Sequence, residues 1–98
     1  MVEKYNDEQI ELAIAELNEQ TQTGWSIKDG MLYHAFDFPN FVSAFGFITQ
    51  VALLAQKLNH HPDWRNSYKT VEFYLSTHKC NGISSLDFNL AKVISELK

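Results

Sequence analysis

Apolar side chains recur three or four positions apart near the start of the chain, separated by acidic and amide residues. The series consists of Ile10, Leu12, Ala13, Ile14 and Leu17. This spacing is typical of a helix with one apolar face, and Asn6 or Asp7 can cap its first turn. We therefore predict an amphipathic helix from about Asp7 to Gln20, ended by Thr23 and Gly24.

After this helix the spacing changes to alternation, which is the pattern of a half-buried β-strand. A short run at 25–27 leads into Lys28-Asp29-Gly30, a turn sequence, and then into Met31 to Phe38. One face of that second run carries Leu32, His34, Phe36 and Phe38, and the other carries Tyr33 and Asp37. These two strands predict a first hairpin.

A second hairpin is predicted from 63–67 and 70–78, with its turn near Tyr68-Lys69. In the later strand an apolar face, carrying Val71, Phe73 and Leu75, alternates with a more polar one. The polar face carries Glu72, Tyr74, Ser76 and His78. His78 is therefore expected at the end of a strand, turned away from the core and toward a site.

Between the hairpins, Pro39-Asn40 interrupts the chain, and a long helix is predicted from Phe41 to Leu58. Two apolar stripes lie side by side on it: Phe41, Phe45, Ile48, Ala52 and Ala55, and then Ala44, Phe47, Val51, Leu54 and Leu58. Together they are wider than one side of a small sheet covers, which predicts a partner subunit. A last helix, Leu86 to Leu97, is predicted after a cap at Ser84 or Ser85.

The order of these elements, α-β-β-α-β-β-α, predicts an α+β fold. We expect a four-stranded antiparallel sheet with three helices packed on one face and the other face open. A length of 98 residues suits a single domain, 1–98, with one core.

The composition narrows the classes of partner and compartment. A net charge of −4 and a pI near 5.4 give no electrostatic reason to bind nucleic acid or an acidic membrane surface. No segment is expected to approach the ~18 apolar residues that span a bilayer, and residues 1–7 lack the features of a signal peptide. The single cysteine, Cys80, fits a reducing compartment and a packed side chain rather than a nucleophile. We expect a cytoplasmic protein without membrane association.

The most informative stretch is Asn59-His60-His61-Pro62, where a helix must end and an extended segment must begin. Pro62 disfavours helical geometry at His61, so the chain turns and both imidazoles can point into one pocket. Acid-base catalysis is one interpretation of this pair. On these residues alone an equally open interpretation is that the pair caps helix carbonyls.

A metal site is a further interpretation of the histidines. It would consist of His60, His61, His78 and Cys80. The spacing matches no zinc pattern, and adjacent histidines bind one ion only through a strained turn, so no metal is expected. His34 belongs to no motif and is interpreted as a structural or surface residue.

These residues form part of a longer set that resembles the pterin-4a-carbinolamine dehydratase family, also described as dimerisation cofactors of a homeodomain transcription factor. The family signature is two histidines and a proline, an aromatic, and then a further histidine and an aspartate at set distances. The corresponding positions here are His60-His61-Pro62, Trp64, Tyr68, His78 and Asp87. Further similarity runs through Gly24-Trp25, Phe36-Asp37-Phe38, Ala44-Phe45-Gly46-Phe47, Val51-Ala52-Leu53 and Ser76-Thr77-His78-Lys79-Cys80. The resemblance covers about 24–94 and favours catalysis over capping.

The resemblance implies loss of water from a 4a-hydroxytetrahydropterin to give the quinonoid dihydropterin, a step that recycles the cofactor of aromatic amino-acid hydroxylases. This reaction uses no metal, flavin or nucleotide, so no cofactor is expected. The departing hydroxyl takes a proton while N5 loses one, and histidine titrates in the right pH range for both. The resemblance assigns this chemistry to His60, His61 and His78 as a set, with acid and base not distinguished.

By the same resemblance the pterin is bound by Asn59, His60, His61, Ser76, Thr77, His78 and Lys79. Trp25 matches a tryptophan near the mouth of the family's site, although an aromatic that fills the first hairpin is an equally open interpretation. Asp87 falls in the first turn of the last helix, where an acidic residue favours the helix dipole, and is interpreted as structural.

Two positions depart from the family pattern. Gln56 stands where relatives commonly carry an acidic residue, and Asn59 stands where an aspartate is frequent. Both changes remove a charge that could orient a histidine ring. Because some family members stabilise a dimeric transcription factor, a non-catalytic protein-interaction module is the alternative function. The resemblance also implies a homo-oligomer, either a dimer or a dimer of dimers.

Overall fold

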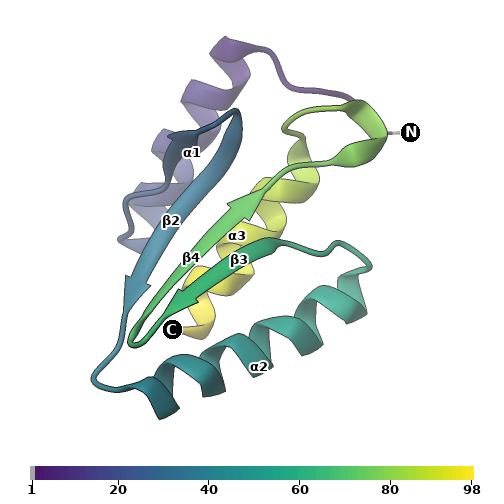
Figure 1. Cartoon of the computed structure of the whole chain (residues 1–98). Helices are drawn as coiled ribbons and strands as arrows, with labels where there is room; N and C mark the ends of the chain where they lie inside the picture. Colours follow the sequence, from purple (N-terminus) through teal and green to yellow (C-terminus); the bar gives the residue numbers. More distant parts are fainter. Residues whose placement is uncertain (1) are drawn as a thin grey trace.

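The computed structural model describes residues 2–98, in which three long helices accompany four strands (Figure 1). In chain order they are α1 (Asp7–Thr21), β1 (Ser26–Lys28), β2 (Met31–Asp37), α2 (Phe41–Leu58), β3 (Asp63–Ser67), β4 (Thr70–Leu75) and α3 (Ser85–Leu97). The strands form one antiparallel sheet in the order β1-β2-β4-β3. The predicted α+β fold and its order of elements are confirmed.

Short polar side chains define where the helices begin. Asn6 caps α1 by accepting from the backbone amide of Gln9 at 2.8 Å, and Asn40 caps α2 by accepting from the amide of Ser43 at 2.8 Å. Ser84 is the cap of α3. Such side chains satisfy amides that lack a partner inside the helix, so each helix starts where the sequence offers a cap.

The two hairpins meet through their later strands. In the first turn Asp29 and Gly30 both have positive φ, 54° and 76°, a geometry that matches the natural twist of the two strands. β2 then pairs with β4 at the centre of the sheet, with Leu32 opposite Leu75. β1 and β3 are left as the two edges of the sheet.

All three helices pack on one face of the sheet. That face and the helices share one core of buried apolar side chains, which includes Leu17, Leu32, Phe36, Ala44, Phe47, Val51, Val71, Phe73, Leu75, Leu90 and Ile94. The ring of Phe47 in α2 lies 5.5 Å from Phe36 and 6.0 Å from Phe73, centroid to centroid, and so joins α2 to both central strands. The other face stays open and carries Tyr33, whose hydroxyl donates to Glu72 at 2.6 Å.

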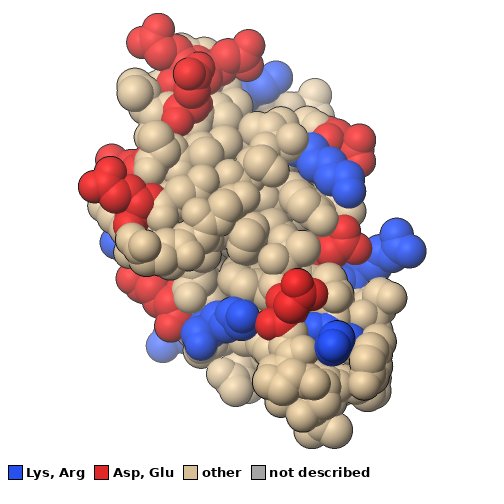
Figure 2. Space-filling view, turned by 90° about the vertical axis from the view of Figure 1, so that its left-hand side faces the viewer, with Lys and Arg blue, Asp and Glu red and all other residues tan. Residues whose placement is uncertain are grey.

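Charged side chains are unevenly distributed over the helices. α1 carries five acidic residues and no basic one, whereas α2 carries no acidic residue and a single basic one, Lys57. Figure 2 shows acidic side chains along the left border, where α1 lies, and a lobe without charge at the lower right, where the chain enters α2. α2 therefore carries the fewest charged side chains of the three long helices.

The expectation that no segment is long and apolar enough to span a membrane is wrong for α2. Its 18 residues have a mean hydropathy of 1.4, which is long and apolar enough for a membrane span by length and composition. Only 28% of this stretch is buried, because one stripe packs against the sheet. The buried stripe consists of Ala44, Phe47, Ile48, Val51 and Ala55. Ala52 and Leu54 are partly buried, and the exposed apolar side chains of α2 are Phe41, Val42, Phe45, Leu53 and Leu58, so its apolar surface is wider than the part that the sheet covers.

Candidate active site

One cavity of about 440 Å³ brings together most of the residues that the sequence singles out. Its walls are the segment from α2 into β3, the segment after β4, and the beginning of α3. The residues that line it are Asn59, His60, His61, Pro62, Asp63, Ser76, Thr77, His78, Lys79 and Leu86. Three histidines from two separate segments therefore border one space, together with four of the predicted binding residues.

The end of α2 positions the two adjacent histidines. Asn59 adopts a left-handed conformation with φ of 54°, and its backbone amide donates to the carbonyl of Gln56 at 3.2 Å. The amide of His60 donates to the carbonyl of Ala55 at 3.1 Å. These backbone contacts close the helix, so neither imidazole is needed as its cap. Both rings are left to make other contacts.

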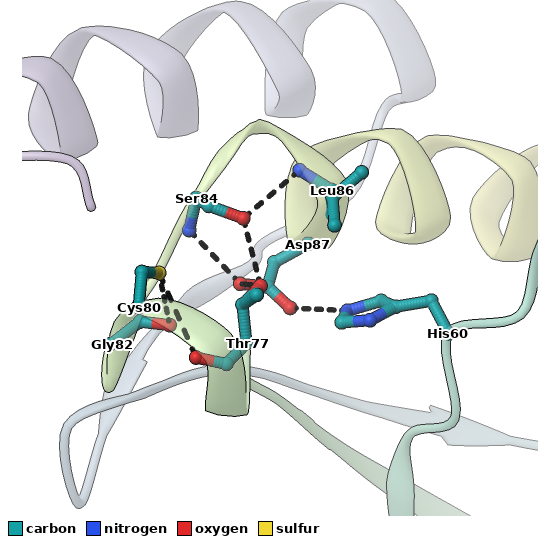
Figure 3. Close-up of polar contacts among 7 residues, drawn as sticks. All are labelled: His60, Thr77, Cys80, Gly82, Ser84, Leu86 and Asp87. Carbon is teal, nitrogen blue, oxygen red and sulfur yellow. Dashed lines mark hydrogen bonds and ion pairs between the residues drawn. The ribbon is translucent and has the colours of Figure 1, made fainter. Parts of the chain in front are cut away.

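His60 points toward the first turn of α3 (Figure 3). Its Nε2 lies 2.7 Å from Oδ1 of Asp87, whose side chain is fully buried. The other carboxylate oxygen, Oδ2, accepts from the hydroxyl of Thr77 at 2.8 Å and from the amide of Ser84 at 3.0 Å. Asp87 is thus the structural helix residue that the sequence predicts, and also the partner of a site histidine, which sequence reasoning missed.

His61 is held by a different kind of group. Its Nε2 lies 3.0 Å from Oε1 of Gln56 in the last turn of α2, and both side chains are exposed. An amide oxygen accepts a hydrogen bond but brings no negative charge. Of two neighbouring imidazoles, one therefore contacts a buried carboxylate and the other an exposed amide.

The prediction that His78 ends a strand is wrong. β4 stops at Leu75, and His78 begins a single 3-10 turn, His78–Cys80. The strand stops because the chain folds back on itself: the amide of Thr77 donates to the carbonyl of Gly82 at 2.7 Å, and the reverse bond is 3.3 Å long. His78 borders the cavity with its side chain exposed, brought there by a turn rather than by strand alternation.

Comparison with known proteins shows the family of the chain. A family model described as pterin 4 alpha carbinolamine dehydratase matches residues 3–97. The chain belongs to this family. A relative in Prochlorococcus marinus (strain MIT 9313) is 51% identical over 75 residues, which cover 76% of this chain and 78% of that protein. Another, in Jannaschia sp. (strain CCS1), is 43% identical over 99 residues, covering 99% of this chain and 98% of that protein. Both are provisionally named pterin-4-alpha-carbinolamine dehydratase.

Solved structures match the fold. A transcriptional coactivator/pterin dehydratase from Brucella melitensis superposes with a TM-score of 0.86 at 35% identity, covering 96% of this chain and 97% of that one. A pterin dehydratase-like protein described as a RuBisCO assembly factor of the alpha-carboxysome has a TM-score of 0.61 at 19% identity, covering 74% and 84%. The second likeness concerns the fold alone. Pterin-dehydratase folds thus occur in proteins with more than one described role.

Trp25 is the one predicted binding residue that does not border the cavity in this dehydratase-family chain. Its side chain is 2% exposed, and its Nε1 donates to Oγ of Ser95 in α3 at 2.8 Å. Its ring also packs edge-on against Phe36 in the core, 6.1 Å between centroids. The structure therefore favours the interpretation in which Trp25 fills the core beside the first hairpin.

Cys80 lies close to the site but is turned into its own loop. Its Sγ lies 3.6 Å from the carbonyl oxygen of Thr77 and 3.8 Å from that of Gly82. Across residues 2–98, no three His, Cys, Asp or Glu side chains come together as a group that could hold a metal ion.

Two further features of the cavity went unpredicted. Leu86 gives it an apolar wall, and Pro62 and Asp63 complete the side next to His61. Leu86 directly precedes Asp87, which belongs to the family signature. This neighbourhood is the one feature of the sequence that could have placed Leu86 near the site. A flat heteroaromatic ligand suits such a site, in which one apolar side chain accompanies several polar groups.

Proposed function

We propose that this protein dehydrates a 4a-hydroxytetrahydropterin to the quinonoid dihydropterin, using His60, His61 and His78 as acid and base groups. The observation that carries the proposal is the cavity bordered by all three histidines, in a chain of the pterin-4a-carbinolamine dehydratase family. The pterin type, the tetrahydrobiopterin-recycling role and the link to aromatic amino-acid hydroxylases are parts of the same proposal.

The reaction requires two proton movements and no oxidant. The 4a-hydroxyl takes a proton from an acid, the C4a–O bond breaks, and water leaves with that bond's electron pair. N5 gives its proton to a base, and the N5–H electron pair becomes the second bond between N5 and C4a. An imidazole can serve either task near neutral pH, so a group of three suits this chemistry without a metal or cofactor.

Substrate binding falls to the groups around the histidines. Ser76 and Lys79 border the cavity, and Asn59 lies on its other side. The hydroxyl of Thr77 is committed to Asp87, its backbone pairs with Gly82, and the residue is 3% exposed, so we assign Thr77 the role of holding this wall of the cavity in place. Hydroxyl, amide and backbone groups match the amide-like edge of a pterin ring, while Leu86 meets its flat face.

The test is an activity assay with synthetic 4a-hydroxytetrahydropterin. The purified protein is expected to accelerate dehydration above the buffer rate, and His61→Ala and His78→Ala are each expected to lose most of that acceleration, by roughly 10²–10⁴-fold for a group that transfers a proton. His34→Gln is the matched control, because His34 does not border the cavity. A wild-type protein with no effect on the rate would refute the enzymatic proposal.

A second role is favoured by the exposed side of α2. Its apolar side chains are accessible to solvent: Phe41 by 48%, Val42 by 78%, Phe45 by 56%, Leu53 by 70% and Leu58 by 49%. We propose that this surface pairs with a second copy of the chain, because two α2 helices, each with a single charged side chain, meet with less repulsion than two identical, highly charged helices would suffer. The dimer or dimer of dimers expected from the family would be built on it.

Light scattering tests this pairing. The wild-type protein is expected to have a mass of at least twice 11.3 kDa, and Leu53→Lys is expected to lower it toward the monomer. Leu12→Lys, on the exposed side of α1 at 67% accessibility, is the matched control and should leave the mass unchanged. A wild-type monomer would exclude self-association, and binding of a helical partner protein by such a monomer would favour the interaction-module alternative.

A further inference from the structure

Asp87 lies behind the cavity wall rather than in it, and it accepts three hydrogen bonds (Figure 3). The donors are Nε2 of His60, the hydroxyl of Thr77 and the backbone amide of Ser84. The Asp87 side chain has no exposed surface. A buried carboxylate with this many aligned donors is held in one orientation by contacts from both ends of the site.

Each hydrogen bond of this network has a definite direction. Thr77 has one hydroxyl hydrogen, and it is donated to Oδ2 of Asp87 at 2.8 Å. The 2.7 Å contact between the hydroxyls of Thr77 and Ser84 must then use the hydrogen of Ser84. The hydroxyl oxygen of Ser84 in turn accepts from the amide of Leu86 at 3.2 Å. With the hydroxyl hydrogens placed in this way, Asp87 is the acceptor in each of its contacts with Thr77 and Ser84.

This direction of donation determines the proton on His60. Oδ2 of Asp87 accepts from two donors, and a carboxylate oxygen such as Oδ1 only accepts. At 2.7 Å from Oδ1, Nε2 of His60 must therefore carry the hydrogen. Among residues 2–98 Nδ1 of the same ring has no hydrogen-bond partner, and it is not a buried unpaired atom. Nδ1 is thus the ring nitrogen left open, on a residue that borders the cavity.

We propose that Asp87 is a positioning residue that holds His60 as the Nε2–H tautomer, so that Nδ1 is the atom through which His60 exchanges a proton with the substrate. The part that concerns the substrate rests on the proposed dehydratase function. The part that concerns the tautomer rests only on the contacts of Asp87. Asp87 itself touches no substrate in this assignment, because the wall of the cavity separates them.

The simpler interpretation is that Asp87 only stabilises the start of α3. It completes a capping box with Ser84, in which the side chain of each residue accepts a hydrogen bond from the backbone amide of the other. The molecule contains a matched case at α1, where Gln9 occupies the same third position and forms the box with Asn6. Gln9 is exposed and contacts no histidine, so it supplies a control for a purely structural role.

The experiment compares Asp87→Asn with the wild-type protein by ¹⁵N NMR of the histidine rings at about pH 8, where imidazole is neutral. The introduced amide keeps its oxygen toward the hydroxyl of Thr77 and the amide of Ser84, because both are donors. Its NH₂ group then faces Nε2 of His60, which must become an acceptor. We expect His60 to be Nε2–H in the wild-type protein and Nδ1–H in the variant, with its signal assigned through His60→Gln.

Kinetics provide the second readout. A histidine held as the wrong tautomer by an amide loses turnover rather than binding, so Asp87→Asn is expected to lower kcat on the order of 10²–10⁴-fold with little change in KM. Gln9→Ala should destabilise α1 and leave both the His60 tautomer and kcat as in the wild-type protein. Equal losses of kcat in the two variants would mean that helix capping alone explains Asp87.

The tautomer measurement on the wild-type protein stands even if the variant does not fold. A wild-type His60 that is Nδ1–H would overturn the proposal outright. An Nε2–H tautomer that persists in a folded Asp87→Asn variant would overturn the role of Asp87. If the tautomer switches but the wild-type protein dehydrates no pterin, the positioning of His60 is supported, and the proposed function is what fails.

Discussion

His34 and the histidines of the cavity are the same residue type in opposite surroundings. His34 lies on the core face of β2, with its ring 5.4 Å from Trp25 and 4.6 Å from Phe36, centroid to centroid. Burial lowers its pKa below the ordinary 6.5. His60 and His61 instead each place Nε2 against an oxygen acceptor beside a cavity. Hydrogen-bond partners and access, rather than residue type, separate a packing histidine from a candidate catalyst.

The largest expected difference is in dehydration activity, when histidine is replaced by glutamine either in the cavity, at His60, or in the core, at His34. In His60→Gln the new amide can still donate to Asp87, so the local network is kept, but this position no longer carries a group that can exchange a proton with the substrate. We expect kcat/KM to fall by roughly 10²–10⁴-fold. His34→Gln should stay close to wild type in the same dehydration assay. A similar loss in both variants would remove the distinction between the two surroundings.

The second-largest difference is expected in stability, when the hydrogen-bond partners of His60 and His61 are each replaced by alanine. Asp87→Ala leaves the amide of Ser84, the hydroxyl of Thr77 and Nε2 of His60 without their acceptor in a buried site. We expect it to cost about 3 kcal/mol of unfolding free energy in urea titrations. Gln56→Ala, at an exposed position, should cost less than about 0.5 kcal/mol. Equal costs would show that the Asp87 network contributes nothing special to stability.

The lowered pKa of His34 should make the stability of the folded protein depend on pH. The unfolded chain takes up a proton on this residue near pH 6.5, while the folded protein resists until a lower pH because burial lowers the pKa of His34. The contribution is therefore present above about pH 6.5 and is lost as the pH falls through the lowered folded value. Urea midpoints between pH 7.5 and 5 should fall less steeply in His34→Gln. Parallel curves for the two proteins would contradict this assignment.

The smallest effect is expected at the acceptor of His61. Gln56→Glu places a carboxylate 3.0 Å from Nε2 in the wild-type geometry, at an exposed position where solvent weakens the attraction. We expect an upward shift of the His61 NMR titration midpoint by less than about one unit, and a stability change within about 0.5 kcal/mol. An unshifted midpoint would mean that this contact does not form in solution.

Much of the fold follows from local pattern. The helical spacing, the caps and the turn at Asp29-Gly30 are short-range signals, and the observed helices differ from the predicted ends by only a residue or so. Seven of the predicted binding residues lie in two short segments, and both segments border one cavity. Contacts between neighbours in the sequence explain the agreement of the helices, and one long motif explains why these two segments were singled out together.

The remaining features depend on contacts between distant parts of the chain. The end of β4 is determined by the pairing of Thr77 with Gly82, which alternation of side chains does not reveal. The partner of His60 lies 27 residues further along, in another helix. Trp25 is removed from the site by its bond to Ser95, 70 residues away. Each of these outcomes is a tertiary contact that competes with a local pattern and prevails.

The position of Asp87 in the first turn of α3 also bears on how the cavity responds to heat and denaturant. Helix ends open more readily than helix centres, and such local opening precedes global unfolding. Fraying of the turn between Ser84 and Asp87 would release the imidazole of His60 while the sheet and the rest of α3 remain folded. Mild heat or denaturant should then abolish the proposed dehydratase activity before far-UV circular dichroism registers any loss of structure. The first turn of α3 would act as the most heat-sensitive element of the site.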